Sequence, residues 1–418
     1  MSRASAAHSG IWLTAGAAAA CLASILAVLL LLFGQGLATF WPSRIVELQL
    51  DDGTRVLGEI ATVADDALVL RASERERIGG GYVRVARSAV IARAEPVDAF
   101  VITLADGRRL FGRGDDIAVA GLASPSAPVE ETLRPNAESF VARIGTFLRH
   151  AGRFLTTTTA APALIGGAFP ALVGTVTLVL LMSLIVMPFG VAAAVYLHER
   201  HDVAAGFVRS AIANLAGVPS IVYGVLGLGL FVHGLGANVD RWFFADRLPV
   251  PTFGSGGLLW AALTLALLTL PVVVVSVEEG LARIPPALRS GSLALGATRG
   301  ETIWRLLLPA ARPALLTGLI LAIARAAGAV APLMLVGVVK LAPALPVDGE
   351  FPFLHPSRQF MHLGFSVYDN ALASPDALRG VPRAYACALL LVVVVIALNL
   401  AAIVLRNRLR ERYRALES

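Results

Sequence analysis

The sequence predicts an all-α polytopic membrane protein with about six transmembrane helices and one small β-rich insertion outside the membrane. Two observations support this prediction. The 418 residues are 56% hydrophobic and only 15% charged, with a mean hydropathy of +0.73, whereas about a quarter of the residues of a soluble domain are charged. The apolar residues form long uncharged runs, and one stretch between these runs alternates polar and apolar residues instead. Lipid is therefore the solvent for much of the chain.

The long apolar runs predict the transmembrane helices. A helix needs ~20 mainly apolar residues to cross the ~30 Å hydrocarbon core of a bilayer. The first run is longer than the ~7–15 apolar residues of a signal-peptide core, so we expect an uncleaved anchor helix, with cleavage after Ala38 as the alternative. The six expected helices lie at roughly 11–37, 170–197, 208–233, 257–277, 313–339 and 384–405.

Arginines beside these runs predict the orientation, because short cytoplasmic loops of membrane proteins are rich in positive charge. The tail carries five arginines between 406 and 414, which predicts a cytoplasmic C-terminus. The arginine-bearing loops 198–209 and 278–312 fall on the same side. We therefore expect a multi-pass protein of the bacterial inner (plasma) membrane with both termini cytoplasmic. The loops expected outside are 38–169, 234–256 and 340–383.

The outer segment has a strand-like pattern. Residues 50–58 and 104–112 resemble each other, and each contains Asp-Gly between alternating runs, which is a strong signal for a β-hairpin. Residues 121–136, rich in Pro, Ser and Ala, predict a linker. Residues 138–155 predict an amphipathic helix that lies on the membrane. The expected domains are an anchor helix (1–40), a periplasmic β-rich insertion with its linker (41–136), a transmembrane domain (137–410) and a cytoplasmic tail (411–418).

Composition and motifs argue against several functions. Lys340 is the only lysine, so the chain lacks the Gly-Lys-Ser/Thr of a Walker A loop. The net charge of +6 comes from arginines that cluster beside apolar runs, and we expect membrane lipid as a partner but no nucleic acid. Cys21 and Cys387 lie in apolar runs and give no metal spacing. His198 and His201 have no third ligand nearby and predict a solvated loop. We therefore expect no enzyme, no catalytic residue, no metal and no cofactor of the chain's own.

The most informative stretch is residues 278–309, between the fourth and fifth expected helices. It predicts two short helices with a turn at Gly296, where a missing Cβ permits a left-handed backbone. Pro309 suits the first turn of the next helix, where its missing N–H costs nothing. Such a helix-turn-helix can dock into a groove on a soluble partner. An ordinary amphipathic loop at the membrane surface is the alternative.

This stretch resembles the coupling-helix motif of ABC importer permeases, Glu-Ala-Ala-x3-Gly-x9-Ile-x-Leu-Pro. Gly296, Leu306, Leu308 and Pro309 fall at the Gly, Ile, Leu and Pro positions, while the opening Glu-Ala-Ala is replaced by the sequence from Ser290 to Ser292. The resemblance implies the type I permease core of an ABC importer, with 278–309 as its coupling loop. The residues expected to contact a separate ATPase are Ser290, Gly291, Leu295, Gly296, Ala297, Thr298, Arg299 and Pro309.

Two further stretches narrow the resemblance. Residues 214–224 (Asn-Leu-Ala-Gly-Val-Pro-Ser-Ile-Val-Tyr-Gly) and 324–333 (Ala-Arg-Ala-Ala-Gly-Ala-Val-Ala-Pro-Leu) are similar to signatures of the A-type permease subunit of phosphate ABC transporters. That family implies the import of inorganic phosphate across the inner membrane, powered by ATP that a partner subunit binds and hydrolyses. The implied partners are a homologous permease subunit, two ATPase subunits and a periplasmic phosphate-binding protein.

The chain departs from this family at two charged positions. The family's Arg of the fourth helix and Glu of the fifth correspond to Val275 and Ala329. Buried charges persist mainly as partners, so the joint loss suggests removal of a pair and a change in gating or substrate. Arg325 is then the basic side chain expected to attract an anion, because its planar fork matches phosphate oxygens. An arginine that snorkels to the cytoplasmic surface is the alternative.

The expected substrate pathway joins Arg325 to residues of the third helix, namely Gly217, Pro219, Ser220 and Tyr223. Two other functions stay open. One is a permease for another oxyanion, such as sulfate or molybdate, which the two missing charges favour. The other is a membrane-anchored sensor or scaffold that binds through its β-rich outer segment. The second alternative leaves the match over 278–309 unexplained.

Overall fold

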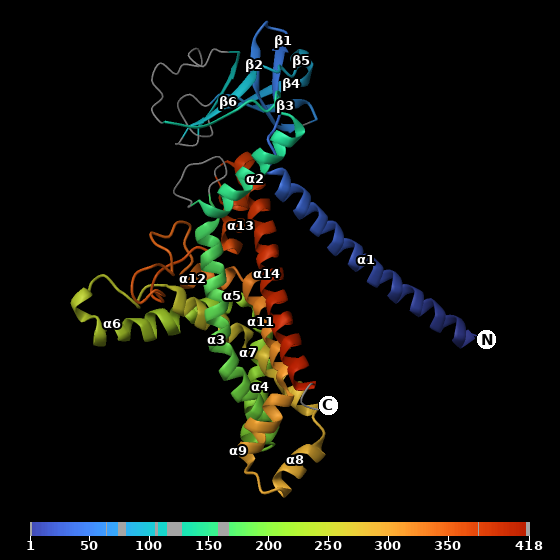
Figure 1. The fold of residues 1–418 in the computed structure, drawn as a ribbon, viewed down its shortest axis with the longest axis vertical. Coiled ribbons are helices and arrows are strands. Elements are labelled where there is room, and N and C mark those ends of the chain that lie inside the picture. Colours follow the sequence, from blue (N-terminus) through green and yellow to red (C-terminus); the bar gives the residue numbers. More distant parts are fainter. Residues whose placement is uncertain are drawn as a thin grey trace. The chain divides into compact units, whose positions relative to one another are not determined.

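A computed structural model describes residues 2–63, 65–73, 81–104, 108–114, 128–157, 167–374 and 376–414. The chain forms two compact units. One contains residues 1–169 and 367–389, and the other contains residues 170–366 and 390–418. Figure 1 shows that strands occur only in the N-terminal part of the described chain and that helices make up the rest. The expected fold class is therefore confirmed.

The first unit contains an antiparallel sheet of five strands in the order β4-β3-β2-β1-β5. The expected hairpin at 50–58 is present, with β1 and β2 joined at Gly53, whose φ of +81° suits a glycine. Alternate residues face a core that includes Val46, Leu48 and Leu70. The strands are β1 (Ile45–Leu50), β2 (Arg55–Val63), β3 (Ala67–Arg71), β4 (Tyr82–Ala86) and β5 (Val90–Ala94).

A second antiparallel sheet has the order β7-β6-β8, formed by β6 (Ala99–Leu104), β7 (Arg109–Arg113) and β8 (Val129–Leu133). The second expected hairpin is the β6–β7 pair, whose turn at 105–107 lies outside the described residues. The expectation that 121–136 is a linker is wrong for its second half, because β8 pairs with β6. Leu133 is buried there. The linker prediction rested on the Pro, Ser and Ala content of the segment and overlooked the short alternating run that ends at Leu133.

Helix α2 (Phe140–Thr156) matches the expected amphipathic helix. Its buried face carries Thr146, His150 and Phe154 at helical spacing. Phe154 packs on Phe40 with ring centroids 5.2 Å apart, just beyond the end of α1 (Ser2–Ala38). The opposite face exposes apolar side chains, which are Phe140, Val141, Ile144, Leu148 and Leu155. That face suits a membrane surface, and the position of α2 on the membrane stays a prediction.

A buried carboxylate joins β8 to α2. Glu131 is 8% exposed and lies 3.0 Å from Arg149 Nη1, 2.8 Å from Arg153 Nη1 and 3.5 Å from His150 Nε2. Its interaction with His150, followed by the charges of Arg153 and Arg149, lowers the pKa of this carboxyl below its ordinary value of 4.5. A buried carboxylate with several cationic partners is costly to leave unpaired.

We predict that Glu131→Gln lowers the free energy of unfolding of this unit by about 1–3 kcal/mol. The value is lower than for a fully buried ion pair because water screens the two partly exposed arginines. Because folding lowers this pKa, the stabilisation is complete above pH 4.5 and is lost as the pH falls below that value. Hydrogen exchange of peptides from β8 and α2 measures the effect. The control is Glu130→Gln, whose carboxylate lies 3.9 Å from Arg153. Equal exchange rates in both variants would contradict the assignment.

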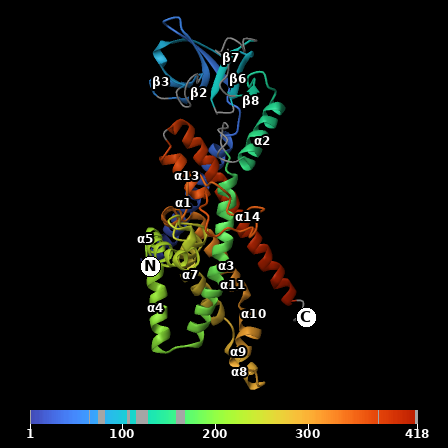
Figure 2. The same cartoon turned by 90° about the vertical axis from the view of Figure 1, so that its left-hand side faces the viewer.

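The second unit is built around α7 (Leu258–Ala282). Of its most apolar 18 residues, 67% are buried. Helix α3 (Phe169–Glu199) approaches α7 where a Cβ on Gly190 would lie 2.5 Å from Val273 Cγ1. Helix α11 (Arg312–Gly328) makes a similarly close approach through Gly318. Small residues let transmembrane helices pack this closely. Figure 2 shows α3 and α4 (Val203–Gly217) joined by a short turn at one end.

Five described helices are long and apolar enough to span a membrane, or six if one bent pair counts as a span. The expected single helix at 208–233 is wrong, because the chain breaks at Val218–Pro219. Helix α4 ends before this break, and a continuous helical stretch, Ser220–Phe243, follows it. Proline lacks the N–H that a helix interior requires. The second stretch comprises α5 (Ser220–Leu226), a π-helical segment η2 (Gly227–Gly236) and α6 (Ala237–Phe243).

The expected helix at 313–339 is also interrupted. Helix α11 ends at Gly328, Ala329 is extended with ψ +96°, and the short helix α12 (Ala331–Val336) follows. Pro332 lies in the first turn of α12, where a missing N–H is tolerated. Two helices complete the chain, α13 (Leu363–Leu372) and α14 (Ala377–Arg414).

Candidate functional site

The segment 278–309 forms the expected helix-turn-helix. Helix α8 (Pro286–Ala294) ends before Gly296, whose φ of +87° is the left-handed conformation that glycine tolerates. Thr298 then caps α9 (Arg299–Glu301) in a capping box, since Thr298 and Glu301 each bond the other's backbone N–H. The turn is therefore specified locally from both sides.

The expected contact residues lie on the surface of this segment. Ser290 and Gly291 are exposed on α8, and Leu295, Gly296, Thr298 and Arg299 are exposed in and after the turn, while Ala297 is half-buried. Leu295 is 91% exposed and Trp304 is 74% exposed. Two large exposed apolar side chains suit a partner surface, and they equally suit the alternative of an amphipathic loop at the membrane surface.

Pro309 is placed differently from the expectation. The transmembrane helix α11 begins at Arg312 with Pro313 in its first turn, whereas Pro309 belongs to α10 (Leu308–Ala310). A π-helical segment, η4 (Thr302–Leu307), precedes it. The chain bends by 65° between Arg299–Ala310 and α11. The transmembrane helix therefore begins near the second proline, Pro313, and not at Pro309.

Two ion pairs tie the segment to neighbouring helices. The guanidinium of Arg289, on α8, pairs with the carboxylate of Glu199 at the end of α3. The guanidinium of Arg209, on α4, lies 2.6 Å from Glu278 near the end of α7. The expectation that the 198–201 stretch is wholly solvated is therefore wrong for Glu199, whose side chain is 14% exposed. The sequence analysis did not predict these two ion pairs. The signal that could have indicated them is the presence of opposite charges at the ends of separate apolar runs.

The depth of Arg325 follows from the register of α11 against α7. Gly318 lies against Ser276, where an added Cβ would be 3.2 Å from the Cβ of Ser276. The two helices run antiparallel, so Arg325, seven residues further along, is level with Thr269 near the middle of α7. Thr269 is more than about 15 Å from either end of α7 at 1.5 Å per residue. This depth argues against an arginine that snorkels to the membrane surface.

The stretches that follow the two helix breaks contact each other and α7. A Cβ on Gly227 would lie 2.2 Å from Thr264 of α7, and one on Gly224 would lie 2.7 Å from the Cα of Pro332. The buried Tyr223 donates a hydrogen bond of 2.5 Å to the carbonyl of Leu215, across the Val218–Pro219 break. Broken helices at the centre of a bundle leave backbone groups free for a ligand, a recurring feature of transporter sites.

Arg325 lies four residues before the break at Ala329 and is exposed. The exposed residues of α11 form one face, which consists of Pro313, Thr317, Leu321, Ala324, Arg325 and Gly328. Tyr223 belongs to the same buried cluster as Ala326, the neighbour of Arg325 along the chain. Gly217, Pro219 and Ser220 lie in and beside the Val218–Pro219 break and are exposed.

The two missing charges are not neighbours. Val275 is 50% exposed on α7 and, by the same register, is level with Leu319. Ala329 lies ten residues further along, roughly 15 Å away at 1.5 Å per residue. The expectation that these positions held one pair is therefore wrong for this fold. Ala329 is instead four residues from Arg325, about one helical turn.

Comparison with known proteins shows the family to which the chain belongs. Residues 139–415 match the family model described as "Binding-protein-dependent transport system inner membrane component". Phosphate transport system permease protein PstA 1 of Mycobacterium tuberculosis is 33% identical over 242 residues, which are 58% of this chain and 71% of that protein. Probable ABC transporter permease protein YqgH of Bacillus subtilis is 35% identical over 185 residues, 44% of this chain, and the match spans only 56% of YqgH.

Solved structures also match. The methionine ABC transporter MetNI, in an inward-facing conformation, aligns over 58% of this chain and 94% of the matched chain with 20% identity and a TM-score of 0.38. A bacterial ABC transporter involved in alginate import aligns over 57% and 78% with 17% identity and a TM-score of 0.41.

The helical bundle and the matched region define a transport subunit rather than a catalytic enzyme. The chain belongs to the family of binding-protein-dependent transport system inner membrane components, and it is a permease component of an ABC importer.

Proposed function

We propose that this permease carries inorganic phosphate across the inner membrane, with Arg325 as a contact for the anion. The placement of Arg325 supports the proposal most directly, because this exposed arginine is level with the middle of α7 and lies four residues before the helix break at Ala329. An anion that leaves water needs a compensating charge, and a guanidinium can hold two phosphate oxygens at once. Relatives named as phosphate transport permeases agree with this substrate.

A second substrate class is another oxyanion, such as sulfate or molybdate. It is favoured by the replacement of two charges that the phosphate family carries, at Val275 and Ala329. Both classes need a cation at mid-depth, so Arg325 serves either one. Competition between phosphate and sulfate for uptake separates them.

We predict that Arg325→Ala reduces phosphate uptake at least about tenfold, the effect of losing one charge-assisted contact of about 1.5 kcal/mol or more. Arg325→Lys should restore uptake only in part, because lysine lacks the planar fork. Uptake of labelled phosphate into cells, normalised to the amount of the protein in the membrane, is the measurement. Arg84→Ala, which removes an exposed arginine of β4, is the control and should keep uptake.

Ala329→Glu should also impair uptake, because its carboxylate would lie one turn from Arg325 and compete with the anion. Adding Val275→Arg should not rescue it, since that position is roughly 15 Å away. Full uptake in Arg325→Ala would refute the proposed contact and leave the backbone amides of Gly217 to Gly224 as the alternative.

We further propose that two ATPase subunits bind and hydrolyse ATP and act on this chain through 278–309. A homologous permease would complete the pore, and a periplasmic phosphate-binding protein would deliver the anion. The exposed Leu295 and Trp304 support an ATPase surface on the segment. The ion pairs of Arg289 with Glu199 and of Arg209 with Glu278 would pass its movement to α3, α4 and α7. This function needs no cofactor bound to the permease itself.

We predict that Gly296→Ala weakens ATPase association about 5–30-fold, because a side chain at φ +87° costs about 1–2 kcal/mol. Gly206→Ala is the matched control, since an added Cβ meets open space at both positions and Gly206 is helical in α4, outside the 278–309 segment. Gly296→Trp should abolish uptake while the protein stays in the membrane. Co-purification of the ATPase and uptake are the measurements, and survival of both in Gly296→Trp would refute the contact.

The orientation proposed from the arginines places both termini in the cytoplasm and residues 38–169 and 340–383 in the periplasm. We predict that a reporter active only in the periplasm is active when fused after Gly121, which lies outside the described residues, and silent when fused after Arg410. The reverse pattern would refute the proposed orientation. A reporter active only in the cytoplasm, fused at the same two positions, is the control.

A further inference from the structure

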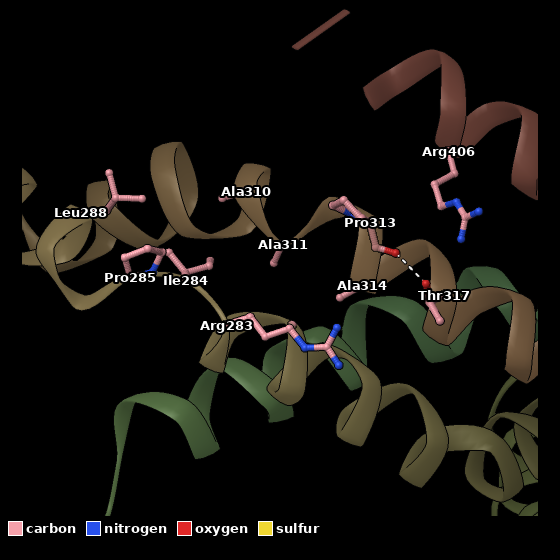
Figure 3. A pocket seen from close by; sticks show the side chains of 11 residues that line it. Arg283, Ile284, Pro285, Leu288, Ala310, Ala311, Pro313, Ala314, Thr317 and Arg406 are labelled. Carbon is pink, nitrogen blue, oxygen red and sulfur yellow. Dashed lines mark hydrogen bonds between the residues drawn. The ribbon is translucent and has the colours of Figure 1, made fainter. Parts of the chain in front are cut away.

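A basic pocket of about 480 Å³ lies where the two ends of the 278–309 segment meet. Gly280 to Leu288 form one wall, Ala310 to Thr317 form another, and Arg406 of α14 completes the pocket. Its volume lies within the ~300–1,000 Å³ of small-molecule sites. Figure 3 shows three polar side chains at this pocket, Arg283, Thr317 and Arg406, which come from three different parts of the chain.

The two arginines are weakly compensated. Arg283 is 83% exposed and reaches Glu279 only at 4.0 Å, a distance at which an exposed ion pair contributes little. Arg406 makes no ion pair or hydrogen bond with any residue in the described part of the chain. The Thr317 hydroxyl donates to the Pro313 carbonyl at 2.8 Å, which leaves its oxygen free to accept. Most of the other residues that line the pocket are apolar. Few protein groups there would therefore compete with an anion for the two arginines.

The pocket continues the face of α11 that carries Arg325. Pro313 and Thr317 line the pocket and belong to that exposed face. Thr317 is eight residues from Arg325, about 12 Å along the helix. On α7, Val275, Glu279 and Arg283 are exposed at helical spacing and lead to the same end. An anion that leaves Arg325 along these faces would therefore reach the two arginines next.

We propose that Arg283 and Arg406 form a second anion site, specific for a phosphoryl group, at the end of the bundle that carries the 278–309 segment. Guanidinium forks match the paired oxygens of a phosphoryl group. Two sources share this chemistry. One is the transported inorganic phosphate at its exit, which rests on the proposed function, and the other is the headgroup of an anionic phospholipid in the adjacent leaflet, which does not.

The walls of the pocket explain what the site does. Ile284, Pro285 and Leu288 belong to the start of the 278–309 segment, and Ala310 and Ala311 follow its end. A movement of the segment therefore changes the distance between the walls. The site holds the phosphoryl group when the walls are close and releases it when they separate, so that its occupancy follows the position of the segment.

The test uses the full-length chain in lipid nanodiscs and measures its melting temperature. Inorganic phosphate is titrated against chloride at equal ionic strength in phosphatidylcholine discs. If phosphate is the ligand, it raises the melting temperature, and Arg283→Gln with Arg406→Gln raises its apparent dissociation constant about tenfold or more. If a lipid is the ligand, discs with phosphatidylglycerol give the higher melting temperature, and the same double variant abolishes that difference. Either result supports the site.

Arg305→Gln is the matched control, because Arg305 is 82% exposed and lies 3.9 Å from Glu301 four residues away, much as Arg283 lies from Glu279. It should keep the shift. Glu279→Gln should strengthen it, because Arg283 loses its competing carboxylate. Shifts that are equal in the wild-type and double-variant proteins, or absent with both ligands, overturn the proposal. Arg325→Ala should remove only the part of the phosphate shift that belongs to Arg325, and the double variant added to it should remove the rest. It should leave the lipid-dependent difference unchanged, so loss of binding at Arg325 and loss of binding at the pocket are separate outcomes.

Discussion

The close contact between α7 and α11 sets the depth of every functional feature in the second unit. A Cβ on Gly280 would lie 2.1 Å from Ala314, and Gly318 lies against Ser276. Water cannot drive association within lipid, so small residues that bring backbones together provide the attraction by close packing. The contact fixes one antiparallel register. That register places Arg325 near the middle of α7 and the pocket of Arg283 and Arg406 at its end.

The helix breaks depend on this frame. Backbone groups that leave a helix within a membrane must be covered by protein or must line a wet cavity. At Val218–Pro219, the Tyr223 hydroxyl covers the carbonyl of Leu215, and Gly224 lets Pro332 approach from the second broken helix. A charged side chain at this depth is also costly in lipid. Both constraints support the proposal that the breaks and Arg325 line a polar passage.

Two ion pairs connect the 278–309 segment to the helices of the second unit. The ion pair of Arg289 with Glu199 and that of Arg209 with Glu278 join the segment to α3, α4 and α7. Helix α7 is long and largely buried. If the proposed ATPase acts on the 278–309 segment, α7 is the element that would carry the motion more than about 15 Å, to the depth of Thr269.

The sequence by itself determined what depends on composition and on local chemistry. The long apolar runs, the Asp-Gly hairpin at Gly53 and the turn at Gly296 were predicted, because hydropathy and the tolerance of glycine for positive φ act within a few residues. The tertiary structure decided which distant residues meet. It divided the expected helix at Ala329, and it covered the backbone freed there and at the Val218–Pro219 break, where the proline itself ends the helix. It also placed Arg325 at mid-depth and separated Val275 from Ala329, because the register of two packed helices is set by side-chain contacts that no single segment encodes.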